Sequence, residues 1–148
     1  MTDKRHYPGQ GQAEPRDKGV FTCVHCHTLV LLKALGTQNR NHCPRCLWSR
    51  HVDESVGDRS ADCLESMEPI GLTTKSNQEL MLVHRCTGCG KVSKNRLAGD
   101  DDNSAVIGAL ENSKTLDLDR RQSITASGVV LCQDRDLVIR QLFGGRGR

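Results

Sequence analysis

The stretches Cys23-Val24-His25-Cys26 and Cys43-Pro44-Arg45-Cys46 decide how this chain folds. Each stretch holds two cysteines with a gap of two residues, and 16 residues lie between the stretches. A two-residue gap lets both thiolates of a turn face one ion about 2.3 Å away. Two such turns at this separation are typical of a tetrahedral zinc site. The spacing therefore predicts one zinc ion bound by these four cysteines.

A third pair, Cys86-Thr87-Gly88-Cys89, is followed by Gly90, which suits a turn that needs a positive φ angle. No fourth pair accompanies it, but Cys63 is the nearest remaining cysteine and could supply a third thiolate. A histidine would complete a second, Cys₃His zinc site. His51 and His84 are the candidates, and the spacing does not choose between them.

Other interpretations exist for these cysteines. Cys63 could be a small buried apolar residue, with Cys86 and Cys89 a redox pair. A redox pair of the thioredoxin type lies between a strand and a helix, and the sequence around Cys86 and Cys89 gives no clear sign of this arrangement. For Cys132, which follows Val129-Val130-Leu131, a buried core thiol is the simpler interpretation.

The composition favours metal binding over disulfides. Only 3% of the 148 residues are aromatic, so the chain has few large rings to fill a core, whereas it has eight cysteines. The first residues are polar, with no apolar run of the length expected of a signal peptide, and we expect no segment that crosses a membrane. We therefore expect a cytoplasmic protein, and cysteines in a reducing compartment bind metal more often than they pair.

The chain divides into three segments. Residues 1–19 read as a flexible polar arm, residues 20–102 as the zinc-binding domain, and residues 103–148 as a C-terminal extension with short helices and a basic tail. Strands are expected at 20–22 and 80–83, and 29–35 could be a strand or a helical turn. Helices are expected at 105–110 and 136–143, the second capped by Asp134 or Asp136 and ended by Gly144. The predicted fold is a small, zinc-stabilised, β-rich module of the zinc-ribbon type, α+β overall.

Arg40-Asn41-His42-Cys43-Pro44 spells the motif after which the RNHCP family of small bacterial proteins is named. The match continues through residues 46–53 and through further short elements that occur in order: Gly57-Asp58-Arg59, Cys63, 67–71, 84–86, Cys89-Gly90, Asn95-Arg96 and Asp100-Asp101. The chain thus resembles this family over residues 20–102.

The resemblance implies a zinc-ribbon type module with no settled activity. It also implies ligation by the seven cysteines already considered, and it favours His51 over His84 as the remaining ligand. These seven are Cys23, Cys26, Cys43, Cys46, Cys63, Cys86 and Cys89. Two zinc ions are expected as cofactors.

Basic side chains accompany the cysteine turns, and the net charge of +3 permits a polyanionic partner without demanding one. We expect phosphate contacts from Arg40, Arg45, Arg50, Lys91, Lys94 and Arg96. Trp48 is expected in the core, with stacking on an exposed base as the alternative. His42 is expected to hydrogen-bond beside the metal, and Asp100-Asp101-Asp102 to form a solvated turn.

These features favour a non-catalytic zinc-binding module associated with RNA or the ribosome. One alternative is a protein–protein adaptor that docks residues 136–143 as an amphipathic helix into a partner. Another is a metal-dependent or thiol-redox enzyme using Cys63, Cys86 and Cys89. Four thiolates at the first site argue for a closed, structural zinc, because a catalytic zinc keeps one position open.

Overall fold

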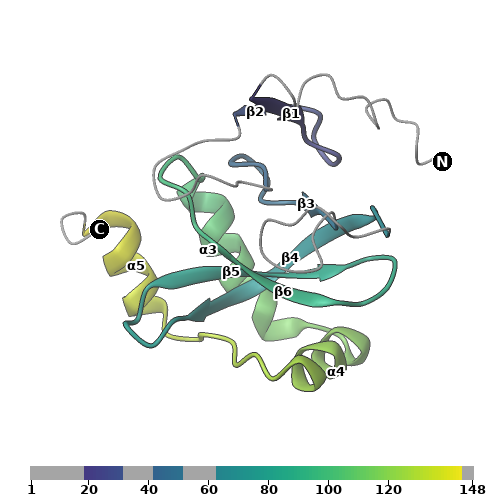
Figure 1. Ribbon diagram of the computed structural model, residues 1–148. Helices are drawn as coiled ribbons and strands as arrows, with labels where there is room; N and C mark the ends of the chain where they lie inside the picture. The colour runs from purple at the N-terminus through teal and green to yellow at the C-terminus, as the bar shows by residue number, and fades with distance from the viewer. Residues whose placement is uncertain (1–18, 32–41, 52–62, 145–148) are drawn as a thin grey trace.

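The structure is a computed structural model that describes residues 19–31, 42–51 and 63–144. These residues form a two-stranded ribbon, a four-stranded antiparallel sheet and three α-helices (Figure 1). The ribbon pairs β1 with β2, and the sheet has the order β3-β4-β5-β6. The strands are β1 (Val20–Thr22), β2 (Leu29–Leu31), β3 (Ser49–Arg50), β4 (Ser66–Thr74), β5 (Leu80–Cys86) and β6 (Val92–Arg96).

The β-rich fold with C-terminal helices is confirmed. The strand expected at 20–22 is β1, and the strand expected at 80–83 is the start of β5, which runs on to Cys86. The segment 29–35, for which a strand or a helical turn was expected, begins as the strand β2, and residues 32–35 lie outside the described residues. The strand β4 was not predicted, because a register shift between Pro69 and Gly71 interrupts the alternation of its side chains.

The C-terminal segment forms α3 (Asn103–Asn112), the 3₁₀ turn η2 (Ser113–Thr115), α4 (Leu118–Ser127) and α5 (Arg135–Phe143). The helices expected at 105–110 and 136–143 correspond to α3 and α5. Asp134 is the N-cap of α5, accepting a 3.0 Å hydrogen bond from the Leu137 N–H, and Gly144 is its C-cap. The third helix, α4, was not predicted, because it carries mostly polar residues that give no apolar stripe.

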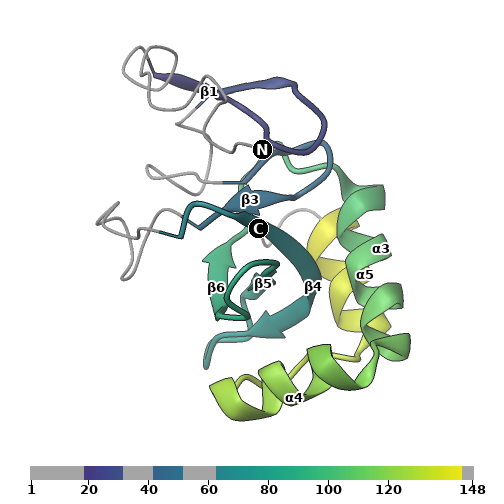
Figure 2. The same ribbon diagram turned by 90° about the vertical axis from the view of Figure 1, so that its right-hand side faces the viewer.

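One face of the large sheet carries the main core. Leu80 and Leu82 alternate along β5 and point to the same face, where they pack with Leu72 of β4. Buried side chains of α3 and α5 complete this cluster: Val106, Ala109, Leu110 and Val138. Figure 2 shows α3 and α5 side by side against this face of the sheet. The C-terminal helices therefore share a core with the strands of the cysteine-rich segment.

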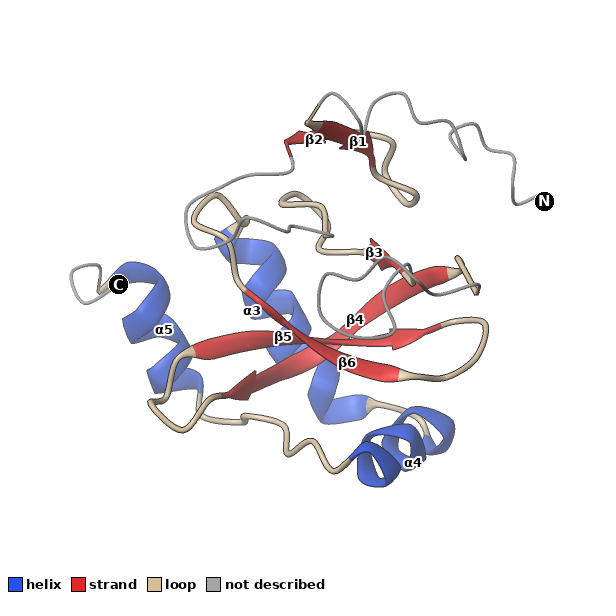
Figure 3. Cartoon of the chain, viewed as in Figure 1, coloured by secondary structure: helices blue, strands red, loops and turns tan. Residues whose placement is uncertain are grey.

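The opposite face of the sheet is covered by α4. Val83, the neighbour of Leu82, points to this side and packs with Ile70 and with Ile124 of α4. Polar contacts fix the helix there: Arg120 bonds Glu68 at 2.9 Å, and Arg85 Nε donates to Ser123 at 2.9 Å. Figure 3 shows the sheet lying between α4 and the β1–β2 ribbon, with α3 behind it.

The β1–β2 ribbon has its own small cluster. Phe21 and Val30, which face each other across the two strands, are buried together with Cys23 and Cys43. Cys132 lies instead against the main core and is half-buried, in line with the expected core thiol. Within the described ranges, no helix combines the length and apolar character needed to cross a membrane.

A core substitution in α3 tests whether the C-terminal helices stabilise the sheet. Leu110 is fully buried, so Leu110→Ala should lower the free energy of unfolding by about 3 kcal/mol in urea denaturation of the zinc-loaded chain. Leu118→Ala is the matched control; its side chain is 58% exposed, and the expected change is below about 0.5 kcal/mol. Equal effects of the two variants would contradict the shared core.

Candidate metal centres

The three Cys-x-x-C turns share one backbone conformation; we call them knuckle 1 (23–26), knuckle 2 (43–46) and knuckle 3 (86–89). In each, the first cysteine N–H donates to the carbonyl five residues later at 2.8–2.9 Å. The residue after the second cysteine donates its N–H back to the first cysteine carbonyl at 2.8–3.0 Å. This pair of bonds closes a tight loop that turns both cysteine side chains to the same side.

The residue after each second cysteine has a positive φ angle. Gly90 has φ 82°, as the sequence predicted, but the same position is taken by His27 (φ 64°) and Leu47 (φ 68°) in the other knuckles. Glycine adopts this conformation without steric cost, whereas other residues do so at a cost. The surrounding structure holds His27 and Leu47 in it, and no glycine marks these two knuckles in the sequence.

Backbone N–H groups point at the first sulfur of each knuckle. In knuckle 1, the N–H groups of His25 and Cys26 lie 3.3 and 3.4 Å from Cys23 Sγ. Arg45 N–H makes the corresponding 3.4 Å contact to Cys43 Sγ in knuckle 2. Hydrogen bonds of this kind favour the charged thiolate over the thiol. The knuckles therefore present sulfurs suited to bind a cation.

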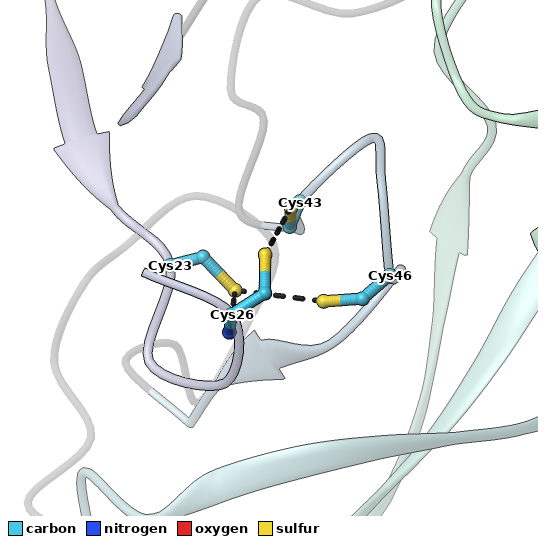
Figure 4. Close-up of side chains that lie close together, drawn as sticks. All are labelled: Cys23, Cys26, Cys43 and Cys46. Atoms are coloured by element: carbon cyan, nitrogen blue, oxygen red, sulfur yellow. Dashed lines mark hydrogen bonds between the residues drawn. The ribbon is translucent and has the colours of Figure 1, made fainter. Parts of the chain in front are cut away.

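The first centre joins knuckles 1 and 2. Sulfurs of Cys23 and Cys46 lie 3.6 Å apart, as do those of Cys26 and Cys43, and all four lie within 4.8 Å of one another (Figure 4). A tetrahedron with Zn–S distances of about 2.3 Å has edges of about 3.8 Å. A disulfide needs sulfurs about 2.05 Å apart. The geometry therefore fits a zinc ion held by four thiolates.

The pKa values of these thiols also indicate that a bound cation would be needed to keep all four ionised. Burial raises the pKa of Cys43, and it raises the pKa of Cys46 as well, where the neighbouring Cys23 adds to the effect. Burial acts in the same direction on Cys26, but hydrogen bonds from Thr28 outweigh it and lower that pKa to about 6. Several thiolates so close together repel one another. A divalent cation bound between them attracts each thiolate and so favours the ionised form.

The second centre lies where β3, β4 and knuckle 3 meet. Cys63 Sγ and Cys86 Sγ are 3.5 Å apart, and Cys89 Sγ is 3.4 Å from His51 Nδ1. All four ligand atoms lie within 4.8 Å of one another. His51 N–H donates to the Glu65 carbonyl at 2.8 Å, which holds the histidine beside the segment that carries Cys63. Two groups of four donors are thus present, matching the two zinc ions expected.

His84, the other candidate ligand, is placed elsewhere. It is fully buried in β5, with Nε2 2.6 Å from the Leu47 carbonyl and Nδ1 2.9 Å from Asn95 Nδ2. Burial and the nearby His42 lower its pKa to about 3, so the ring is neutral and donates through Nε2. His84 therefore ties the sheet to the backbone after knuckle 2, while His51 faces the second centre.

His42 of the RNHCP motif binds a carboxylate. Its Nε2 lies 2.9 and 3.0 Å from the two oxygens of Asp101, whose side chain is only 3% exposed. The expectation that all three aspartates form a solvated turn was therefore wrong for Asp101. The next residue, Asp102, donates its N–H to the Pro44 carbonyl at 2.8 Å. The turn before α3 is thus fixed onto knuckle 2.

The residues expected to contact phosphate occupy different parts of the surface. Arg45 is exposed in knuckle 2, and Lys94 and Arg96 are exposed in β6, where Arg96 Nε lies 3.6 Å from Glu79. Arg50 and Lys91 are half-buried, and Arg50 donates to the Leu64 carbonyl at 3.1 Å. Arg40 lies outside the described residues. Their role in phosphate binding stays a prediction.

Trp48 does not fill the core. It is half-buried, and its ring stacks on the His25 ring with centroids 4.3 Å apart and planes 2° apart. Leu47 takes the buried position in the main core instead. The expectation of a core tryptophan was wrong, because the positive φ at Leu47 turns this residue inward and leaves its neighbour beside knuckle 1.

A comparison with protein families gives the affiliation of the chain. The family model of the RNHCP domain matches residues 18–107, which is more than half of the sequence. The chain belongs to the RNHCP domain family. Both candidate metal centres and the His42–Asp101 pair of this RNHCP domain lie within the matched range. Searches among curated proteins and among solved structures found no match.

Zinc stoichiometry distinguishes the two histidines of the RNHCP domain. We expect two bound ions in native mass spectrometry of the intact chain, one ion after His51→Gln, and two ions after His84→Gln. Only the His51 substitution should remove an ion, because His51 Nδ1 faces Cys89, whereas both ring nitrogens of His84 face other groups. A His51→Gln variant that still binds two ions after equilibration with a weak chelator would contradict the geometry.

Removal of the buried carboxylate tests the contact between the Asp101 turn and knuckle 2. Asp101→Ala leaves His42 and the Ala98 N–H without their acceptor, so the free energy of unfolding should fall by about 2–3 kcal/mol in chemical denaturation. Asp101→Asn keeps one acceptor oxygen and should recover part of this loss. A stability unchanged by Asp101→Ala would show that the pair contributes little.

Proposed function

We propose that this RNHCP domain is a non-catalytic zinc-binding module that binds RNA, either free or within an assembly such as the ribosome. The observation that carries the proposal is the completeness of the two centres, each of which has four donor atoms from the chain itself. A catalytic zinc keeps one coordination position for water or substrate, and four protein ligands leave none. Zinc in these centres would supply structural cross-links and no reaction.

Exposed cations in knuckle 2 and in β6 support an anionic partner. Arg45 projects from knuckle 2, and Lys94 projects from β6, the strand that follows knuckle 3. Arg45 has no carboxylate partner among the described residues, in contrast to Arg96. The net charge of +3 adds a weak general attraction for phosphate. The proposal places the protein in the cytoplasm, where thiols stay reduced and RNA is abundant.

The adaptor alternative has less support. Val138 of α5 is fully buried and Leu142 packs against the main core, so the apolar face of this helix is already in use. Phe143 at the end of α5 is 59% exposed and is the feature that an adaptor could still use. The redox alternative at the second centre is disfavoured by His51, which lies among the three sulfurs as a fourth donor.

Salt dependence of RNA binding tests the proposal. The zinc-loaded chain should bind a single-stranded RNA with an affinity that falls as salt rises, because each phosphate contact releases counterions. Arg45→Gln combined with Lys94→Gln should reduce the slope of log affinity against log salt by about 0.7 for each phosphate that the variant no longer neutralises. Fluorescence anisotropy with a labelled oligonucleotide gives these slopes.

Two cations distant from the metal centres provide the matched control. Lys114 and Arg135 both lie beside Glu111, at 3.5 and 3.4 Å, so Lys114→Gln with Arg135→Gln removes the same total charge. This control should leave the slope unchanged. A binding curve insensitive to salt, or an equal effect of the two double variants, would count against an RNA-binding surface at the knuckles.

A further inference from the structure

The stacked pair His25–Trp48 is the feature of the first centre that metal binding does not explain. The two rings are parallel to within 2° at a centroid distance of 4.3 Å. They come from different elements, since His25 belongs to knuckle 1 and Trp48 follows knuckle 2. His25 is exposed and Trp48 is half-buried, so a planar aromatic stack reaches from the zinc centre to the surface.

The backbone around both rings is fixed by the knuckles. The His25 N–H points at Cys23 Sγ at 3.3 Å, and the Trp48 carbonyl accepts the Cys43 N–H at 2.9 Å. Zinc bound by the four cysteines would join the two knuckles and hold the rings in register. A ligand that stacks on a preformed surface loses less binding energy to ordering than one that must arrange flexible side chains.

We infer that knuckle 1 carries a stacking site for one unpaired nucleobase, on the outer side of the His25 imidazole with Trp48 behind it. The inference rests on the proposed RNA-binding function and names the contact that function would use. Unpaired bases stack on aromatic side chains in single-strand recognition, and histidine serves in this role. Arg45 is exposed in knuckle 2, whose cysteines face those of knuckle 1, and it is the cation that we expect to meet an adjoining phosphate.

Trp48 is the only tryptophan of the chain, so its fluorescence reports directly on this stack. The experiment titrates the zinc-loaded full chain with a short single-stranded RNA and with an abasic oligonucleotide of equal length and phosphate number. We expect the RNA to quench Trp48 and to bind roughly tenfold more tightly than the abasic strand, the range of one stacked base.

Substitutions at His25 separate stacking from structure. His25→Ala should bring the preference for RNA over the abasic strand close to unity, while native mass spectrometry still counts two zinc ions. His25→Phe keeps a ring and should keep the preference. His27→Asn is the matched control, since His27 is exposed in the same knuckle, has no stacked partner among the described rings, and has a positive φ that asparagine tolerates.

The outcomes distinguish this inference from the proposed function. RNA and abasic strands that bind equally well, with no quenching of Trp48, would overturn the stacking site while leaving an RNA-binding role through phosphates intact. A preference that survives His25→Ala would overturn it as well. Absence of binding to either strand at low salt would overturn both proposals together.

Discussion

The fold depends on one short segment, residues 42–51, that takes part in both metal centres. Cys43 and Cys46 belong to the first centre and His51 to the second. Between them, Leu47 is buried in the main core, and its carbonyl accepts the bond from His84 of β5. Metal binding, hydrophobic packing and the sheet therefore meet within a few residues. In a chain with so few aromatic rings, thiolate–zinc bonds would supply cohesion that a larger core provides elsewhere.

The two parts of the molecule depend on metal to different extents. The four-stranded sheet has apolar clusters on both faces, covered by α3 and α5 on one side and α4 on the other. Among the described residues, the β1–β2 ribbon has only the small cluster around Phe21 and Val30, and two of its members are metal-facing cysteines. Zinc binding contributes directly to folding free energy where a preformed core is small. We therefore expect the position of the ribbon to depend more on the first metal centre than the position of the four-stranded sheet does.

The sequence was most informative where the determinant is local. A two-residue gap between cysteines fixes a knuckle through its own backbone, so all three knuckles could be predicted from spacing. The choice of His51 over His84 depends on how β4 pairs with β3 on one side and with β5 on the other, and spacing along the chain says nothing of that. The pair formed by His42 and Asp101 joins distant positions and had no local sign. Similarly, α4 is held by Arg120, Ile124 and their partners in the sheet, because its own sequence lacks an apolar stripe.

The charged residues of β6 have a consequence for self-association. In the described part of the chain β6 ends the sheet, so one side of this strand offers backbone groups that another strand could pair with. Lys94 and Arg96 are exposed along it. Like charges brought together by edge-to-edge pairing of two copies would repel, and natural sheets use lysine at their edges in this way. Independently of the proposed role in phosphate binding, these cations would therefore disfavour pairing of the open sheet edge with a second copy of the chain.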